Sequence, residues 1–121
     1  MQTAAKAPHI DDAALIKKAA RNAATQAGLS MRELAAIIGC RRETLSRSTA
    51  ELSGKQAELA LLFLRSQRSL SALTGGSRSH IRHWMRTRNL HLGDQVPKTL
   101  MQSVDGLVRS VTYLDAMRGK L

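Results

Sequence analysis

The hydrophobic pattern begins after a short irregular stretch, and residues 1–10 are predicted to form a flexible tail. Apolar residues then recur at helical spacing, which predicts a helix that Gly28 ends. Asp11 and Asp12 are its expected N-caps, because carboxylates suit the positive end of a helix. Lys17 falls elsewhere on the helical wheel from the apolar stripe. The first element is therefore expected to be an amphipathic helix.

Three further helices are predicted before the glycine pair at residues 75–76. The first begins at a Ser-x-x-Glu capping box formed by Ser30 and Glu33. A short helix over about residues 41–48 follows it, and a long helix runs from about Lys55 toward the glycine pair. The glycine pair is the clearest linker in the chain.

The chain beyond this linker predicts three more short helices, over about residues 79–86, 97–101 and 106–117. Pro97 suits the first turn of the second of these helices, and Gly106 suits a turn or helix end before the third. No segment alternates as a strand does, so the predicted fold is all-α. We expect a helix-turn-helix bundle over residues 11–74 and a small helical domain over residues 75–121.

The chain has 121 residues and a formal charge of +10, which predicts a polyanionic partner: nucleic acid, an acidic protein or a membrane surface. The charge is densest in residues 55–90, where seven Lys and Arg stand against one Glu. One Phe, one Trp and one Tyr are too few for a stacking platform on single-stranded nucleic acid. The single cysteine, Cys40, fits a reducing cytoplasm, and no apolar run is long enough to span a bilayer.

Residues 31–48 carry the pattern of a DNA-reading helix-turn-helix. Ala35 is the small residue required where two helices cross, and Gly39, four residues later, tolerates the positive φ of the turn. The expected inward-facing residues are Leu34, Ile38, Cys40 and Leu45. The motif resembles the Xre class of Cro and phage-repressor domains. The same spacing also occurs in helical bundles that bind no DNA, so plain packing remains an alternative.

The Xre resemblance implies a set of DNA contacts at Arg41, Arg42, Glu43, Ser46 and Arg47. Carried over from the family by position, Arg42, Glu43 and Arg47 would face base edges, where arginine suits guanine and glutamate can accept from cytosine. Arg41 and Ser46 would touch phosphates or neighbouring bases. Two positions depart from the family pattern. Arg41 replaces the usual Ser or Thr N-cap, and Ser48 replaces an apolar residue that helps the recognition helix to dock.

The last third of the chain has an ordered series of motifs: Trp84, Asn89, Leu-x-Leu-Gly at 90–93, Pro97, Gly106 and a Leu-Asp-Ala-Met ending. Trp84, the only tryptophan, is expected in the core, as large hydrophobes usually are. A buried stripe is expected at Leu107, Val108, Val111, Leu114 and Met117. As a whole, the series resembles the toxin-binding domain of the Xre/MbcA/ParS antitoxins.

This second resemblance implies a type II toxin–antitoxin partner, commonly a RES-type toxin that resembles ADP-ribosyltransferases and degrades NAD. The antitoxin of such a pair covers the entrance to the toxin's active site. The resemblance implies toxin contacts at Arg88, Asn89, Asp115, Arg118, Gly119, Lys120 and Leu121. It also implies a domain core of Trp84, Leu92, Pro97, Leu107, Val111 and Leu114. A frayed, basic helix end is the alternative interpretation of the C-terminus.

The remaining patterns predict no chemistry of the chain's own. His80 and His83 share a helix face, but neighbouring arginines disfavour a metal cation there, so neither a metal nor another cofactor is expected. We therefore expect a cytoplasmic, non-enzymatic homodimer that binds a RES toxin and its own promoter DNA, and no membrane. The alternatives are a stand-alone transcriptional repressor and a purely protein-binding inhibitor whose helix-turn-helix no longer reads DNA.

Overall fold

The computed structural model describes residues 10–121, and this part of the chain is built from helices. The elements are α1 (Ile10–Gln26), α2 (Met31–Ile38), α3 (Arg42–Ser46), α4 (Gly54–Thr74), α5 (Arg78–Arg86), the 3₁₀ helix η1 (Leu90–Leu92), α6 (Pro97–Leu100) and α7 (Val104–Arg118). The only strand-like pairing in this range is an isolated bridge between Asn89 and Gln95. The predicted all-α fold is confirmed. Within residues 10–121, no helix combines the length and apolar character needed to cross a membrane.

Helix α1 starts earlier than the sequence pattern indicated. Asp11 and Asp12 were predicted to cap this helix but lie inside its first turn. Ile10, assigned above to the tail, is helical. Residues 1–9 lie outside the described residues, so the flexible tail remains a prediction for them.

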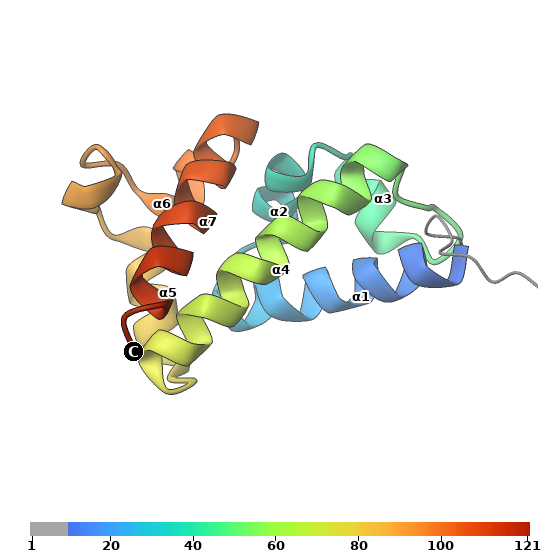
Figure 1. Ribbon diagram of the computed structural model, residues 1–121. Coiled ribbons are helices and arrows are strands. Elements are labelled where there is room, and N and C mark those ends of the chain that lie inside the picture. Colours follow the sequence, from blue (N-terminus) through green and yellow to red (C-terminus); the bar gives the residue numbers. More distant parts are fainter. Residues whose placement is uncertain (1–9) are drawn as a thin grey trace, which may run out of the picture.

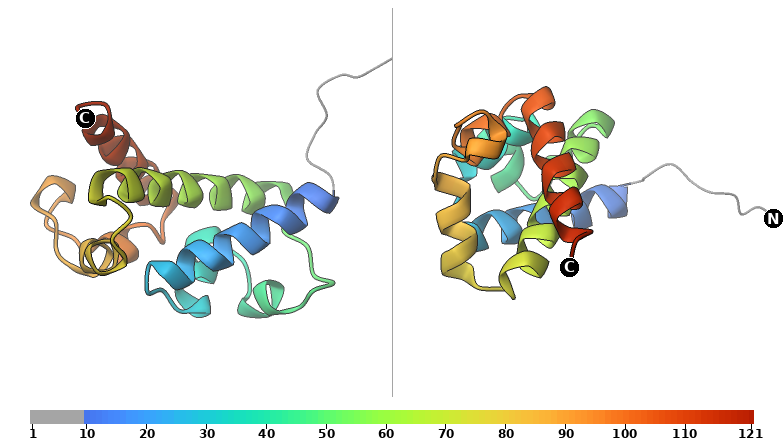
Figure 2. Two further views of the ribbon diagram at one scale, coloured as in Figure 1. Left: turned by 90° about the horizontal axis from the view of Figure 1, so that it is seen from below. Right: turned by 60° about the vertical axis from the view of Figure 1, so that its left-hand side comes forward.

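Helix α4 passes through the middle of the molecule, with α1–α3 on one side and α5–α7 on the other (Figures 1 and 2). It packs against α1, α2, α5 and α7. Its N-terminus has a capping box that the sequence analysis did not identify: Ser53 and Gln56 each bond the other's backbone N–H. Its C-terminus ends at Gly75, which has φ +66° in the left-handed region.

The apolar core is continuous across both sides of α4. Phe63 of α4 is fully buried and shares one cluster with buried alanines of α1 and buried leucines of α7. Trp84 packs against this cluster but is only partly buried, which corrects its prediction as a core residue. A wide, amphipathic indole on a short surface helix can cover the core edge without entering it.

Helix α7 differs from its prediction at three residues, Gly106, Val108 and Met117, of which Met117 is only partly buried. Gly106 is neither a turn nor a helix end: α7 begins at Val104, and Gly106 is buried in its first turn. A Cβ at this position would lie 1.9 Å from the carbonyl oxygen of Leu100, so Gly106 permits a close backbone approach between α6 and α7. Val108, predicted in the buried stripe, is 45% exposed. The stripe is therefore narrower than helical spacing alone indicated.

Two polar contacts join the helices after α4 to those before it. The Arg82 guanidinium donates to the carbonyl oxygens of Thr25 and Gln26, at 3.1 Å each, and so caps the C-terminal end of α1. The Lys98 ammonium forms an ion pair with Glu33 at 2.7 Å. The two sides of the molecule therefore touch through charged groups as well as through α4.

Candidate functional site

Helices α2 and α3 have the local geometry of a helix-turn-helix. The predicted capping box is present, with Glu33 N–H donating to Ser30 Oγ at 3.0 Å and Ser30 N–H donating to Glu33 Oε1 at 2.9 Å. Ala35 is buried, and Gly39 adopts φ +80° and donates its N–H to the Ala35 carbonyl at 2.8 Å. Partial burial raises the pKa of the Cys40 thiol, which keeps it neutral beside the core.

Helix α3 is shorter than the predicted helix over residues 41–48. It covers only Arg42–Ser46, and Arg47 is already extended at φ −85° and ψ +126°. Arg41 occupies the N-cap without a side-chain hydrogen bond to the helix, as expected for a residue with no acceptor. Ser48 lies beyond the helix in a turn. With no apolar side chain at position 48 to bury, nothing rewards another helical turn there.

A buried lysine holds the end of α3 in place. Lys17 Nζ donates to the carbonyl oxygens of Thr44 at 3.1 Å, Arg47 at 2.8 Å and Ala50. Its side chain is 7% exposed, and its charge lies at the negative end of α3, where it is favourable. The sequence analysis placed Lys17 away from the buried stripe. The signal that identifies it is its spacing to Ala20 and Ala24, both fully buried on the same face.

The five predicted DNA-contact residues all lie on the surface, on α3 or directly beside it. They are Arg41, Arg42, Glu43, Ser46 and Arg47. None of the three arginines forms an ion pair within the described residues, so their guanidinium groups are available. Ser46 Oγ donates to the backbone carbonyl of Glu43 at 3.3 Å, so this hydrogen bond does not involve the Glu43 carboxylate. The surface at α3 therefore carries three exposed arginines and one exposed carboxylate, that of Glu43.

The loop between α5 and α6 holds two of the predicted toxin contacts. Asn89 is structural here: its side-chain oxygen accepts from His91 N–H at 2.9 Å, and its own N–H donates to the Gln95 carbonyl at 3.0 Å. The His91 ring stacks on Tyr113 of α7, with centroids 5.5 Å apart. Arg88 is exposed, and the adjacent Leu90 is 82% exposed, a candidate contact that the sequence analysis missed.

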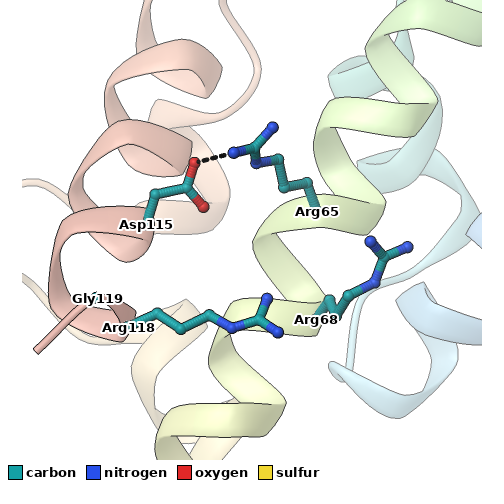
Figure 3. Close-up of a pocket in the computed structure, with 5 residues that line it drawn as sticks. All are labelled: Arg65, Arg68, Asp115, Arg118 and Gly119. Carbon is teal, nitrogen blue, oxygen red and sulfur yellow. Dashed lines mark ion pairs between the residues drawn. The ribbon is translucent and has the colours of Figure 1, made fainter. Parts of the chain in front are cut away.

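The other predicted toxin contacts gather at the end of α7, next to two arginines of α4. Asp115, Arg118 and Gly119 line a hollow of about 520 Å³ together with Arg65 and Arg68 (Figure 3). The Asp115 carboxylate pairs with Arg65 at 2.8 Å and accepts from Ser69 Oγ at 3.3 Å. From the sequence alone, Arg65 and Arg68 fit a solvated face, a dimer contact or a phosphate-tracking surface, with the solvated face as the default, because only the fold brings residues fifty positions apart into contact.

The remaining predicted residues divide between core and surface. Lys120 and Leu121 are exposed at the C-terminus. The buried members of the predicted domain core are Leu92, Pro97, Leu107, Val111 and Leu114. Leu107, Val111 and Leu114 belong to the same apolar cluster as the buried residues of α4, so α7 continues that core.

Two family models match the chain. Residues 7–65 match the antitoxin Xre-like helix-turn-helix domain, and residues 69–120 match the antitoxin Xre/MbcA/ParS C-terminal toxin-binding domain. The chain belongs to the Xre/MbcA/ParS antitoxins. No curated protein matches it. The matched domains are of DNA-binding and toxin-binding kinds, and neither is an enzymatic kind.

The two matched ranges also show how the helices divide between the helix-turn-helix match and the toxin-binding match. They meet between residues 65 and 69, inside α4, and the domain boundary at the glycine pair after that helix stays a prediction. Helix α4 therefore contributes to both domains. Arg65 closes the first match and Asp115 lies in the second, so their ion pair connects the two domains.

Proposed function

We propose that this antitoxin neutralises a RES-type, NAD-degrading toxin by covering the entrance to its active site, and that it represses its own operon. The observation that carries the first part is the exposed end of the chain. At the end of α7 and just beyond it, the exposed residues Arg118, Gly119, Lys120 and Leu121 carry two basic side chains into solvent. Such groups make charge-assisted hydrogen bonds with the polar lining of a dinucleotide pocket.

The test of neutralisation is a truncation after Met117, which removes the exposed end and leaves the buried residues of α7 in place. We expect the truncated antitoxin to keep its melting temperature within a few degrees, since exposed termini contribute little to stability. It should fail to restore growth and NAD levels when co-expressed with the toxin. Full rescue by the truncated chain, at equal expression, would count against this mechanism.

Operator binding is supported by the exposed arginines on α3 and beside it, which form no ion pair within the described residues. Replacing Arg42 and Arg47 with alanine should weaken binding to the promoter by roughly a hundredfold, because each base contact is worth about 1–3 kcal/mol. The matched control removes two exposed arginines of α5, Arg78 and Arg86, and should change promoter affinity much less. Unchanged affinity of the Arg42 and Arg47 variant would remove the DNA assignment.

A homodimer follows from the same proposal, since helix-turn-helix proteins usually bind two half-sites as dimers. Sedimentation of the antitoxin with and without a promoter duplex tests this stoichiometry. A monomer that binds one half-site would refute it.

One observation favours a second candidate function, a protein-binding inhibitor that no longer reads DNA. Helix α3 has five residues, and Arg47 lies outside it. Promoter binding measured across a range of salt separates the two functions. Phosphate contacts release counterions, so a true DNA reader loses affinity steeply as salt rises.

A further inference from the structure

The exposed side of α4 has two adjoining hollows of different chemistry. The first is the basic hollow lined by Arg65, Arg68, Asp115, Arg118 and Gly119 (Figure 3). The second, of about 380 Å³, is lined by Glu58, Leu61, Leu62 and Arg65. Arg65 lines both, so the two hollows form one continuous surface, called here the α4–α7 face. Because neither hollow is enclosed in the core, this face is accessible to a partner.

The basic hollow has more positive than negative charge. Asp115 is its only carboxylate, and that group is committed to Arg65 at 2.8 Å. Within the described residues, Arg68 and Arg118 form no ion pair, and Figure 3 shows both on the rim of the same hollow. Two guanidinium groups are thus left for an incoming anion, and their planar forks suit carboxylates and phosphates alike.

The adjoining hollow decides which of these anions fits better. Leu61 is 48% exposed and precedes Arg65 by one helical turn. On α7, Val108 lines neither hollow, but it is 45% exposed and precedes Asp115 by seven residues, so it lies on the same helix face and extends the α4–α7 face along α7. Phosphates gain nothing from exposed leucine and valine, whereas a protein segment can cover them. The face therefore fits a polypeptide with both acidic and apolar side chains.

The charge also argues against a second copy of this chain as the occupant. A twofold contact centred on the basic hollow would bring Arg68 and Arg118 close to the same arginines of the other copy. Like charges held together at an interface cost several kcal/mol. A chain of net charge +10 offers few acidic side chains to offset that repulsion.

We propose that the α4–α7 face docks an acidic and apolar segment of the toxin. Its carboxylates lie between Arg68 and Arg118, and its apolar side chains cover Leu61 and Val108. This inference rests on the proposed function for the identity of the partner. It adds a contact made by α4, a helix shared by both domains, to the contacts of the C-terminal end.

The test measures binding of the purified RES-domain toxin to the full antitoxin and to its Arg68→Glu/Arg118→Glu variant. We expect the variant to bind roughly 30- to 100-fold more weakly, as for close interfacial charge pairs. The neutral variant Arg68→Gln/Arg118→Gln should lose less. The matched control, Arg21→Glu/Arg32→Glu, makes the same charge change on exposed residues of α1 and α2 and should bind toxin normally.

Each result has a separate meaning. If the wild-type antitoxin does not bind the toxin, the proposed function fails, and this inference fails with it. If the wild type and the charge-reversed variant bind toxin equally, only the docking face is refuted. If the charge-reversed variant binds promoter DNA more weakly but binds the toxin as the wild type does, the α4–α7 face contacts nucleic-acid phosphates, and the inference is overturned. Circular dichroism and melting curves of each variant establish that it is folded.

Discussion

The helices before α4 and the helices after it pack on the same central helix but are held in place differently. In α1–α3, the turn between α2 and α3 is set by short-range features, the capping box of Ser30 and Glu33 and the left-handed Gly39, and Lys17 adds a long-range anchor. In α5–α7, the decisive contacts join different elements, such as Gly106 of α7 against Leu100 of α6 and His91 of η1 against Tyr113 of α7. The difference teaches that a local motif can be read along the chain, whereas a surface assembled from distant segments cannot.

The two candidate binding surfaces follow the same division. The DNA-contact residues lie within seven consecutive positions, from Arg41 to Arg47. The α4–α7 face combines Arg65 of one helix with Asp115 of another. Each surface should therefore fail separately when its own support is removed, and the predictions below test that independence.

The largest effect is expected at Gly106. The Gly106→Ala variant adds a Cβ that would lie 1.9 Å from the Leu100 carbonyl oxygen, and neither backbone can move without unpacking α6 from α7. We expect the free energy of unfolding to fall by about 3 kcal/mol, at the upper end for overpacking. Toxin binding should weaken with it, while the geometry of α2 and α3 is retained. Denaturant titration and toxin binding measure the two effects.

The control for Gly106 is Gly54→Ala at the start of α4. A Cβ at Gly54 would meet nothing within 4 Å. We expect this variant to be neutral or slightly more stable, because alanine has less backbone entropy to lose. If the Gly106 variant matched it, close backbone approach would not be what holds α6 against α7.

The second largest effect is expected at Lys17, which holds the end of α3 on the other side of α4. The Lys17→Met variant keeps the length of the side chain but cannot donate to the carbonyls of Thr44, Arg47 and Ala50. We expect a loss of about 2 kcal/mol in unfolding free energy, because charge-assisted hydrogen bonds are removed from a buried site. Promoter affinity should fall as α3 loosens, with toxin affinity unchanged.

The matched control for Lys17 is Lys18→Met, one residue along α1 and exposed. It should leave both stability and promoter affinity close to the wild type. A Lys17→Met variant with normal promoter affinity would show that α3 keeps its position without this anchor.

How far the sequence predicts this structure depends on the distance between the interacting residues. The helices, the capping box at Ser30 and the turn at Gly39 follow from spacing within one or two helical turns. Lys17 was misplaced because a polar residue on a buried face is recognised only when its acceptors, here carbonyls near α3, are known. Gly106 was misplaced because its role depends on a backbone that arrives from another helix.

The candidate sites show the same limit. The DNA-contact residues could be named from one motif, although the early end of α3 before Arg47 could not. At the C-terminus, Asp115 and Arg118 were found through resemblance to a family, while Arg65 and Arg68 stayed ambiguous because a charged helix face is usually just solvated. Only tertiary contact distinguishes a solvated arginine from one that lines a shared hollow.

The smallest predicted effect tests the ion pair that joins the two sides, Glu33 with Lys98 at 2.7 Å. The Lys98 ammonium, followed by the Ser30 N–H, lowers the pKa of Glu33 below its ordinary 4.5. A carboxyl group with a lowered folded-state pKa stabilises the fold above its ordinary pKa, and this contribution is lost as the pH falls through the folded-state pKa. The Glu33→Gln variant keeps the capping box, since glutamine also serves at that position, but removes the charge.

We therefore expect Glu33→Gln to be less stable than the wild type at neutral pH, by at most about 1 kcal/mol, because the pair is partly exposed and screened by solvent. The difference should shrink as the pH falls below the ordinary pKa of Glu33, and it should also shrink in high salt. Melting temperatures of both proteins across the acidic range measure this. The control is Glu51→Gln, at an exposed residue that forms no ion pair within residues 10–121. A difference in melting temperature between the wild type and Glu33→Gln that stayed constant with pH would mean that the charge of Glu33 does not link the two sides of the molecule. The link would then rest on Arg82 and on the shared helix α4.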